Sequence, residues 1–309
     1  MARHARIKAM ESGAVFYHLY CRAAGREGEY PLQSKEARHQ MISLLKFYQS
    51  IYQMRVGGFC VMGNHYHLVV EFSQFREMSR DELYKMASKL YKNEKAKLAG
   101  WTVERWAQFN RRLFDVSEFM RNFQAAFARW FNGLYERKGR FWGDRFKSTL
   151  LEDHAAMLDC LWYVELNAVR AGIVQRPELY EGSSLFFREV KDDRWMIPLM
   201  ELLPSRSRQQ SLVEYRAAIY YRGNVRTRSG QGEIPDHVVR EEEQRGFTTP
   251  GVYRKRLRHF VDGLVVGSEG FVLRYLNELR EAGVYLRRCN ALNARVGGAM
   301  MLREQRGSG

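Results

Sequence analysis

The chain has 309 residues, of which 45% are hydrophobic, and it carries a formal net charge of +15. This apolar fraction is enough for a sizeable core and excludes a largely disordered chain, and no run of about 20 apolar residues is available to span a membrane. The 50 Lys and Arg residues are interleaved with 13% aromatic residues, a balance that favours polyanions, and nucleic acid first among them. The alternative is a soluble protein whose surface is merely basic.

The four cysteines, at positions 21, 60, 160 and 289, form no Cys-x-x-Cys pair. We therefore expect buried or free thiols in a reducing compartment, and no structural zinc. The first 25 residues are basic but contain no continuous apolar core before a small-residue cleavage site. This pattern predicts a cytoplasmic protein.

The beginning of the chain predicts a strand, a helix and a hairpin. Residues 14–23 are rich in β-branched and aromatic residues, which is typical of a strand. In 36–53 the apolar residues recur at steps of three and four, as on one buried helical face. The strand-like runs 55–62 and 65–72 then flank a Gly-Asn pair, two residue types that tolerate a tight turn.

The next segments predict an insertion followed by a helix, a strand and a helix. Residues 75–115 are polar with mixed charge, so we expect an inserted, partly helical element with a solvated face. A continuous apolar stripe over 117–135 predicts a core helix, and a strand over 146–151 and a helix over 154–174 follow. The resulting order predicts an α+β fold with helices packed on an antiparallel sheet.

The character of the chain changes beyond residue 174, where Pro, Gly, Ser and Arg mark loops. We therefore expect one domain over 1–190 and a basic, mainly helical C-terminal extension over 191–309, which could hold an extra DNA-binding element. The basic runs 226–228 and 254–258 could contact a duplex, although a solvated charge run is the default interpretation.

His65 and His67 stand one residue apart in the second strand of the predicted hairpin. Because residues i and i+2 of a strand share a face, the two imidazoles project side by side, as two ligands of one metal ion would. With eight His in the chain, such a pair can also arise by chance, so it needs support from elsewhere.

The predicted helix over 154–174 offers that support. At about 100° per residue, Tyr163, Asn167 and Arg170 fall together on a flank roughly 110° from the apolar face. One helix edge thus presents a phenol, an amide and a guanidinium. Taken alone, a tyrosine on such a flank is more often a core-edge residue than a nucleophile.

Several motifs, in this order, resemble the single-tyrosine HUH transposases, particularly the REP-associated tyrosine transposases of bacteria. They are YHLYCR at 17–22, VMGNHYHLVV at 61–70, the helix and basic-aromatic segment at 119–153, YVELNAVRAGIV at 163–174 and YEGSS at 180–184. The resemblance covers about residues 6–190, and the chain is similar to long members with a C-terminal extension. It departs from the family at Ala168, where proline is usual, at Tyr66, where an aliphatic residue is more common, and in the long 75–115 segment.

The resemblance implies a ferredoxin-like or RRM-like HUH endonuclease domain with Tyr163 as nucleophile. It implies that His65, His67 and Asn167 bind Mg²⁺ or Mn²⁺. The activity it implies is cleavage and rejoining of single-stranded DNA beside hairpin-forming palindromic repeats, through a 5′-phosphotyrosine and a free 3′-hydroxyl. It also implies a bacterial, nucleoid-associated protein that acts as a monomer or homodimer.

These roles are physically reasonable. Neutral imidazoles and an amide oxygen leave a divalent cation its full charge to stabilise a reacting phosphate, whereas a zinc site would usually add further His, Cys or carboxylate ligands. A phenol with a pKa near 10 is a better leaving group than an aliphatic alcohol, so rejoining needs no ATP. Glu165 points to a different helix face and is expected to be structural.

We expect DNA contacts from the basic-aromatic segment and from the flank of the nucleophile helix. The cations can neutralise phosphates, and the aromatic rings can stack on unpaired bases or pack beneath the loop. The candidates are Arg137, Lys138, Arg140, Phe141, Trp142, Arg145, Lys147 and Arg170. Two other functions stay open: a domesticated protein that only binds nucleic-acid hairpins, and a metal-dependent phosphodiesterase that uses water.

Overall fold

In the part of the chain that the structure describes, seven strands form one sheet in the order β2-β3-β1-β4-β5-β7-β6. The computed structural model describes residues 13–26, 28–203, 205, 207–225, 230–247, 263–281, 289–296 and 299–304. The basic runs 226–228 and 254–258 lie outside these residues. No helix in the described ranges is long and apolar enough to cross a membrane.

The first part of the chain forms a ferredoxin-like unit. Strands β1 (Val15–Arg22), β2 (Met54–Val61), β3 (His65–Phe72) and β4 (Lys147–Leu151) pair antiparallel in the order β2-β3-β1-β4. Helix α1 (Lys35–Gln49) joins β1 to β2, and α5 (Val116–Leu134) precedes β4. This β-α-β-β-α-β order confirms the predicted α+β fold class.

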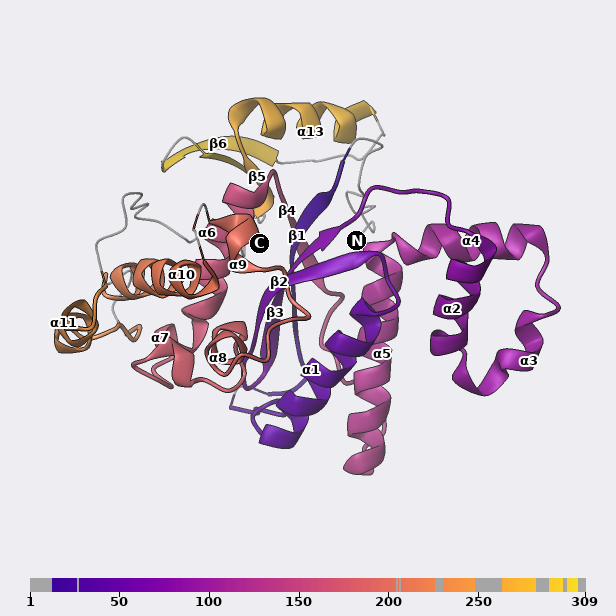
Figure 1. Cartoon of the computed structure of the whole chain (residues 1–309), viewed down its shortest axis with the longest axis horizontal. Coiled ribbons are helices and arrows are strands. Elements are labelled where there is room, and N and C mark those ends of the chain that lie inside the picture. Colours follow the sequence, from indigo (N-terminus) through magenta and orange to yellow (C-terminus); the bar gives the residue numbers. More distant parts are fainter. Residues whose placement is uncertain are drawn as a thin grey trace.

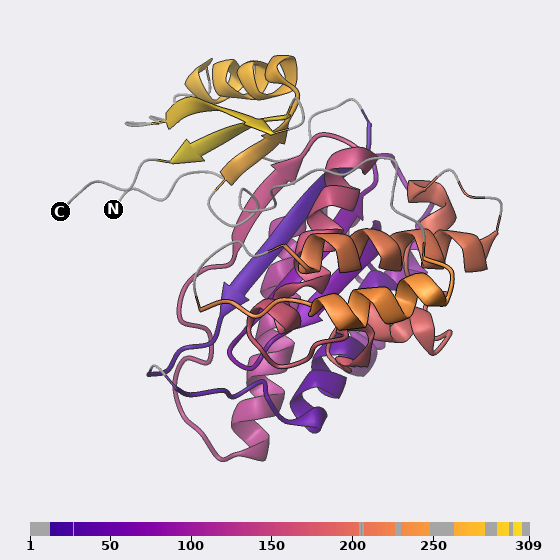
Figure 2. The same ribbon diagram turned by 90° about the vertical axis from the view of Figure 1, so that its left-hand side faces the viewer.

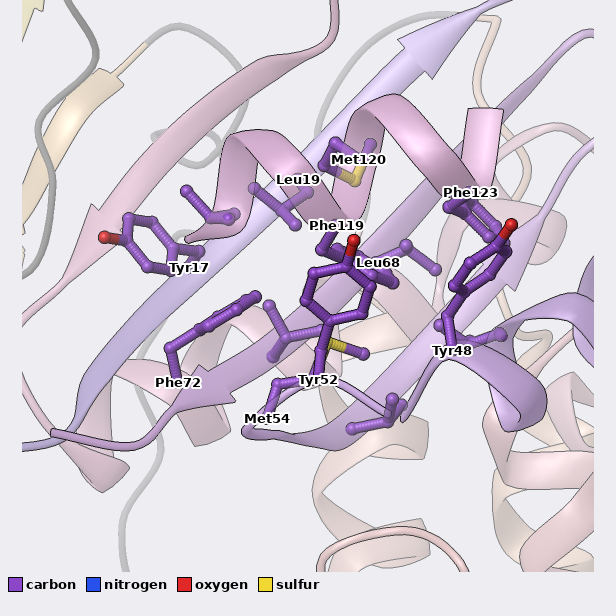
Figure 3. Packing of buried hydrophobic residues seen from close by; sticks show 14 of the residues in the cluster. Tyr17, Leu19, Tyr48, Tyr52, Met54, Leu68, Phe72, Phe119, Met120 and Phe123 are labelled. Atoms are coloured by element: carbon purple, nitrogen blue, oxygen red, sulfur yellow. The ribbon is translucent and has the colours of Figure 1, made fainter. Parts of the chain in front are cut away.

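Helices cover both faces of this sheet (Figure 1). Helices α1 and α5 pack on one face, where alternate strand residues such as Tyr17, Leu19 and Leu68 meet Phe119 and Phe123 in a buried core (Figure 3). The N-terminal ends of the two helices are capped by Ser34 and Asp115, whose side chains accept hydrogen bonds from backbone N–H groups of the first turn.

The second face is covered by helices that follow β4 in the chain. These are α6 (His154–Glu165), α7 (Asn167–Arg170), α8 (Ser184–Glu189), α9 (Leu199–Leu202) and α10 (Arg208–Gly223), with the 3₁₀ turn η2 (Pro177–Leu179) between α7 and α8. A separate apolar cluster joins them to the sheet through strand residues such as Phe16, Cys60 and Val69. Because strand side chains alternate, β1 and β3 present a different set of residues to this face.

The predicted insertion consists of α2 (Arg80–Leu90), η1 (Lys92–Glu94), α3 (Lys95–Leu98) and α4 (Val103–Leu113). These helices project from the side of the sheet that carries α5 (Figure 1). They have their own aromatic packing, in which the ring centroids of Trp101 and Trp106 lie 4.6 Å apart and the Arg80 guanidinium lies 3.9 Å from the Trp106 ring centroid. The charged residues between the aromatic ones are mostly exposed, as predicted.

The C-terminal part contains strands as well as helices. Helices α11 (Asp236–Gln244) and α13 (Glu269–Glu281) agree with the prediction, whereas β5 (Gly263–Gly267), β6 (Cys289–Val296) and β7 (Ala299–Glu304) were not predicted. Strand β5 pairs parallel to β4 and extends the sheet, and the gold and yellow elements in Figure 2 lie at that end of the molecule. A short apolar run such as GLVVG shows no periodicity that would distinguish a strand from a helix. Its secondary structure is decided only by whether a neighbouring strand is available to pair with it. The domain boundary at residue 190 stays a prediction.

Cys21, Cys60 and Cys160 are free and buried. Burial raises the pKa of the Cys21 thiol to about 11, and those of Cys60 and Cys160 lie well above their usual range for the same reason. A thiol with a raised pKa is a poor nucleophile and a poor metal ligand. These three cysteines are therefore part of the core.

Candidate functional site

The histidine pair lies on the sheet face that α6 covers. His65 and His67 open β3, and their ring centroids are 5.2 Å apart. His67 is 3% exposed, while His65 is only partly covered. Tyr66 between them points to the opposite core, as the strand alternation predicts.

The neighbouring strand adds a third histidine that sequence reasoning did not single out. His18 on β1 is completely buried, and its Nε2 atom lies 2.9 Å from Nδ1 of His67. Tyr20, two residues further along β1, pairs in register with His67 and stacks on its ring at 5.7 Å. The alternation in the YHLY stretch indicated that His18 and Tyr20 share a face, but nothing local indicated that β1 lies beside β3.

Helix α6 brings Tyr163 to these histidines. The Tyr163 ring stands edge-on to His67 with centroids 5.8 Å apart, and to His18 with centroids 6.0 Å apart. Its side chain is half-buried, so the phenol is shielded without being sealed from solvent. A segment far along the chain thus supplies a phenol to the face where the histidine pair lies.

Asn167 follows Tyr163 by one helical turn, where the predicted single helix is divided at Leu166 into α6 and α7. The Asn167 Nδ2 atom donates hydrogen bonds to the backbone carbonyls of Tyr163 and Val164, each at 3.1 Å. A backbone carbonyl can only accept a hydrogen bond, so the Nδ2 end of the amide must face the two carbonyls. The orientation of the Asn167 amide is therefore fixed. They tie the end of α6 in place and leave Oδ1 as the atom that could bind a cation.

Burial keeps the histidine pair neutral. It lowers the pKa of His65 to about 4, with a further contribution from the Arg22 guanidinium. It also lowers the pKa of His67 well below its usual range, assisted by His18 and His65. Neutral imidazole is the form that binds metal ions.

The hydrogen bonds of the pair fit a role in metal binding. Nδ1 of His65 lies 2.8 Å from Oδ1 of Asn64, and Nδ1 of His67 is paired with His18. Ligand histidines usually hold one ring nitrogen in such a bond and coordinate through the other. No group of three or more His, Cys, Asp and Glu suited to a metal occurs in the described part of the chain. Mg²⁺ commonly takes its remaining ligands from oxygen donors and water.

Lys147 is the DNA-binding candidate that lies beside this cluster. It opens β4, pairs in register with Tyr20, and its Nζ atom lies 5.6 Å from the Tyr20 ring centroid. The side chain is exposed, so its charge is available to an anion that approaches the histidines.

The other candidates of the basic-aromatic segment divide into exposed cations and packed rings. Arg137, Lys138, Arg140 and Arg145 are exposed. Phe141 is 2% exposed and packs on Phe127 and Phe131, with ring centroids 5.2 Å and 4.7 Å away. Phe141 therefore belongs to the core in this structure, with no face open to a base.

Trp142 is half-buried and attached to α5. Its Nε1 atom donates to the backbone carbonyl of Gln124 at 2.9 Å, and its ring centroid lies 5.3 Å from that of Tyr66. These contacts support the loop from beneath. Whether its partly exposed side also stacks on a base stays a prediction.

Two further residues of the α6–α7 segment are held by contacts within the protein. Arg170 donates hydrogen bonds to the backbone carbonyls of Gly232 and Arg222, at 3.1 Å and 2.8 Å, and so joins α7 to the end of α10 and to the segment that follows it. Glu165 is completely buried, and it accepts hydrogen bonds from the Ser184 hydroxyl, the Leu185 N–H and the Tyr215 hydroxyl. Burial raises the pKa of Glu165 to about 7. Its position agrees with the structural role expected from the sequence.

No family model matches the chain, and no curated protein matches it. Among solved structures, the chain is similar to one described as a REP-associated tyrosine transposase bound to a REP hairpin. The similarity covers 64% of this chain and 89% of that chain, with 15% sequence identity and a TM-score of 0.39. Such a distant likeness assigns no activity to this chain.

Proposed function

We propose that this protein cleaves and rejoins single-stranded DNA, with Tyr163 as the nucleophile. The observation that carries the proposal is the contact of the Tyr163 ring with both His67 and His18, at centroid distances of 5.8 Å and 6.0 Å. Here a half-buried phenol meets two imidazoles on a strongly basic protein, which is a combination suited to phosphate chemistry.

The residues present fit a divalent cation of the Mg²⁺ or Mn²⁺ type. His65 and His67 would hold it through Nε2, and Asn167 through Oδ1. When bound, such a cation polarises the scissile phosphate and stabilises the negative charge that develops during the reaction. The protein itself holds the two rings by the Asn64 and His18 hydrogen bonds.

The proposed reaction is a reversible exchange of phosphate esters. The Tyr163 oxygen attacks phosphorus, and its proton passes to solvent, which reaches the half-buried side chain. The bond from phosphorus to the 3′-oxygen breaks, and that oxygen takes up a proton as a free 3′-hydroxyl. Attack of a 3′-hydroxyl on the phosphotyrosine releases the phenol again, so the strand is rejoined without an external energy source.

The proposed substrate is single-stranded DNA beside a hairpin-forming repeat, as in transposition. Lys147 stands next to the histidine cluster, and the exposed Arg137, Lys138, Arg140 and Arg145 lie on the loop that leads to it. Such cations can follow a phosphate backbone from a hairpin stem to a cleavage point.

The test is covalent capture. Purified protein is incubated with Mn²⁺ and oligonucleotides from the DNA that flanks its own coding sequence, and adducts that resist SDS are counted. Wild-type protein should form an adduct, and Tyr163→Phe should abolish it. Tyr84→Phe is the matched control, because Tyr84 is 47% exposed on α2, within the insertion. An adduct in Tyr163→Phe would show that the nucleophile assignment is wrong.

The alternatives predict different results in the same assay. A phosphodiesterase that uses water would cut the DNA without any adduct, and a pure hairpin-binding protein would bind and do neither. His65→Ala and His67→Ala should lose cleavage but keep most of the hairpin affinity, because the cation acts on one phosphate only. Equal loss of cleavage and binding would indicate a structural histidine pair.

A further inference from the structure

A small polar pocket opens at the end of β1, beside the histidine pair. It has a volume of about 250 Å³ and is lined mainly by Arg22, Gly25, Arg26, Glu29 and Asn64. At about 30 Å³ per water molecule, this is the volume of roughly eight waters. The space suits part of one nucleotide and is too small for a base pair.

The pocket is joined directly to the candidate metal ligands. Asn64 lines the pocket, and its Oδ1 atom lies 2.8 Å from Nδ1 of His65. Arg22 is the register partner of His65 across the β1–β3 pair. An anion between Arg22 and His65 would therefore meet a guanidinium on one side and a candidate cation site on the other.

The pocket is also joined to the basic-aromatic loop. The backbone N–H of Ala24 donates to the carbonyl of Phe141 at 2.7 Å, and the N–H of Gly143 donates to the carbonyl of Arg22 at 3.0 Å. These bonds hold residues 140–143 against the wall of the pocket. A strand that leaves the loop toward His65 would therefore pass over the pocket.

The charges of the pocket are available to a ligand. Arg22 and Arg26 are exposed, and no ion pair involves either of them among the residues that the structure describes. Arg55 and Arg112, by contrast, are each paired with a carboxylate, at 2.7 Å. Glu29 is the one carboxylate in the lining, so the balance of the pocket stays positive.

Resting on the proposed function, we propose that this pocket binds one unpaired nucleotide of the DNA strand next to His65. Arg22 and Arg26 contact its phosphate, and Asn64 couples the occupied pocket to the His65 ring. The pocket thereby selects single-stranded over duplex DNA at the entrance to the reaction centre. This proposal gives Arg22, Arg26 and Asn64 a DNA-binding role, which the sequence motifs do not suggest for them.

The test compares two DNA probes in the Tyr163→Phe background, where no covalent step can contribute. Binding of a labelled oligothymidine and of a blunt hairpin without single-stranded ends is measured by fluorescence anisotropy at several salt concentrations. The double variant Arg22→Ala/Arg26→Ala should bind oligothymidine about tenfold more weakly at 0.1 M salt. The slope of the logarithm of its affinity against the logarithm of the salt concentration should be shallower by roughly 1.4. Its affinity for the blunt hairpin should not change.

Two control variants make the comparison specific. Arg111→Ala removes an exposed arginine from α4 and should leave both affinities as they are. Glu29→Gln removes the carboxylate and should strengthen oligothymidine binding. Equal weakening on both probes, or unchanged oligothymidine binding by the double variant, would overturn the pocket assignment. If wild-type protein never forms an adduct, the proposed reaction fails, while the two-probe comparison still decides the pocket.

Discussion

The Nε2 atom of His18 lies 2.9 Å from the Nδ1 atom of His67, and both rings are buried on the sheet face that carries Tyr163. This hydrogen bond fixes the ring plane of His67 and determines which of its nitrogens faces outward. We therefore predict that His18 positions His67 for metal binding. The same ring also borders Tyr163, so His18 connects the two halves of the proposed reaction centre.

Replacement of His18 should weaken metal binding without unfolding the protein. We expect His18→Phe to lower the Mn²⁺ affinity by about 10- to 100-fold, the usual effect of losing a hydrogen-bond partner of a ligand. His18→Gln should restore part of it, because its amide can reach His67. Electron paramagnetic resonance titration of Mn²⁺ and a thermal melt on each variant provide the measurement. Unchanged Mn²⁺ affinity in a folded His18→Phe protein would contradict the positioning role.

Glu165 should make stability depend on pH near neutrality. Its pKa is about 7 in the folded protein, against 4.5 for an ordinary glutamate, so the folded state keeps a proton that the unfolded chain has released. The retained proton contributes fully to the free energy of unfolding below pH 4.5. This contribution, on the order of 3 kcal/mol, is lost as the pH rises through 7. Glu165→Gln should remove this fall. Urea unfolding between pH 5 and 8 measures it, and parallel curves for the two proteins would argue against a buried proton at this site.

Trp142→Ala should first affect stability. The Trp142 ring packs on Tyr66 and donates to the Gln124 carbonyl, and truncation of a buried aromatic ring costs about 3 kcal/mol or more, less where the ring is partly exposed. Trp142→Phe keeps the ring packing and should recover most of the melting temperature. If Trp142 also stacks on a base, hairpin affinity should fall by about 1 to 3 kcal/mol even under conditions where the variant is fully folded. Full affinity of the folded variant would restrict Trp142 to a structural role.

The exposed arginines of the same loop should act through charge. Arg140→Ala and Arg145→Ala together should reduce hairpin affinity and flatten its salt dependence by roughly 0.7 to 0.9 in log–log slope for each lost phosphate contact. Arg140 also donates to the Gly143 carbonyl at 2.8 Å, so Arg145→Ala alone is the cleaner single variant. Salt-dependent anisotropy on a hairpin measures the effect. Unchanged affinity in the double variant would remove this loop from the recognition surface.

Local patterns in the sequence were sufficient for most elements of the ferredoxin-like unit. Strand alternation placed His65 and His67 on one face, and helical periodicity set Tyr163 and Asn167 on one flank, because both periods depend only on neighbouring residues. In the structure the rings of His65 and His67 lie 5.2 Å apart, and the Tyr163 ring meets His67. The short helix break at Leu166 was not predicted, since it depends on the bonds of a single amide.

Cross-strand and interlayer relationships were decided only by the tertiary structure. His18 becomes a partner of His67 because β1 pairs with β3, and the register of two distant strands leaves no periodic trace in either of them. Tertiary packing likewise placed Phe141 in the core and brought Arg170 to the backbone carbonyls of Arg222 and Gly232. The sequence by itself determined which side chains share a face of each element. Only packing decided which faces meet, because that choice depends on the burial of the whole apolar surface rather than on neighbouring residues.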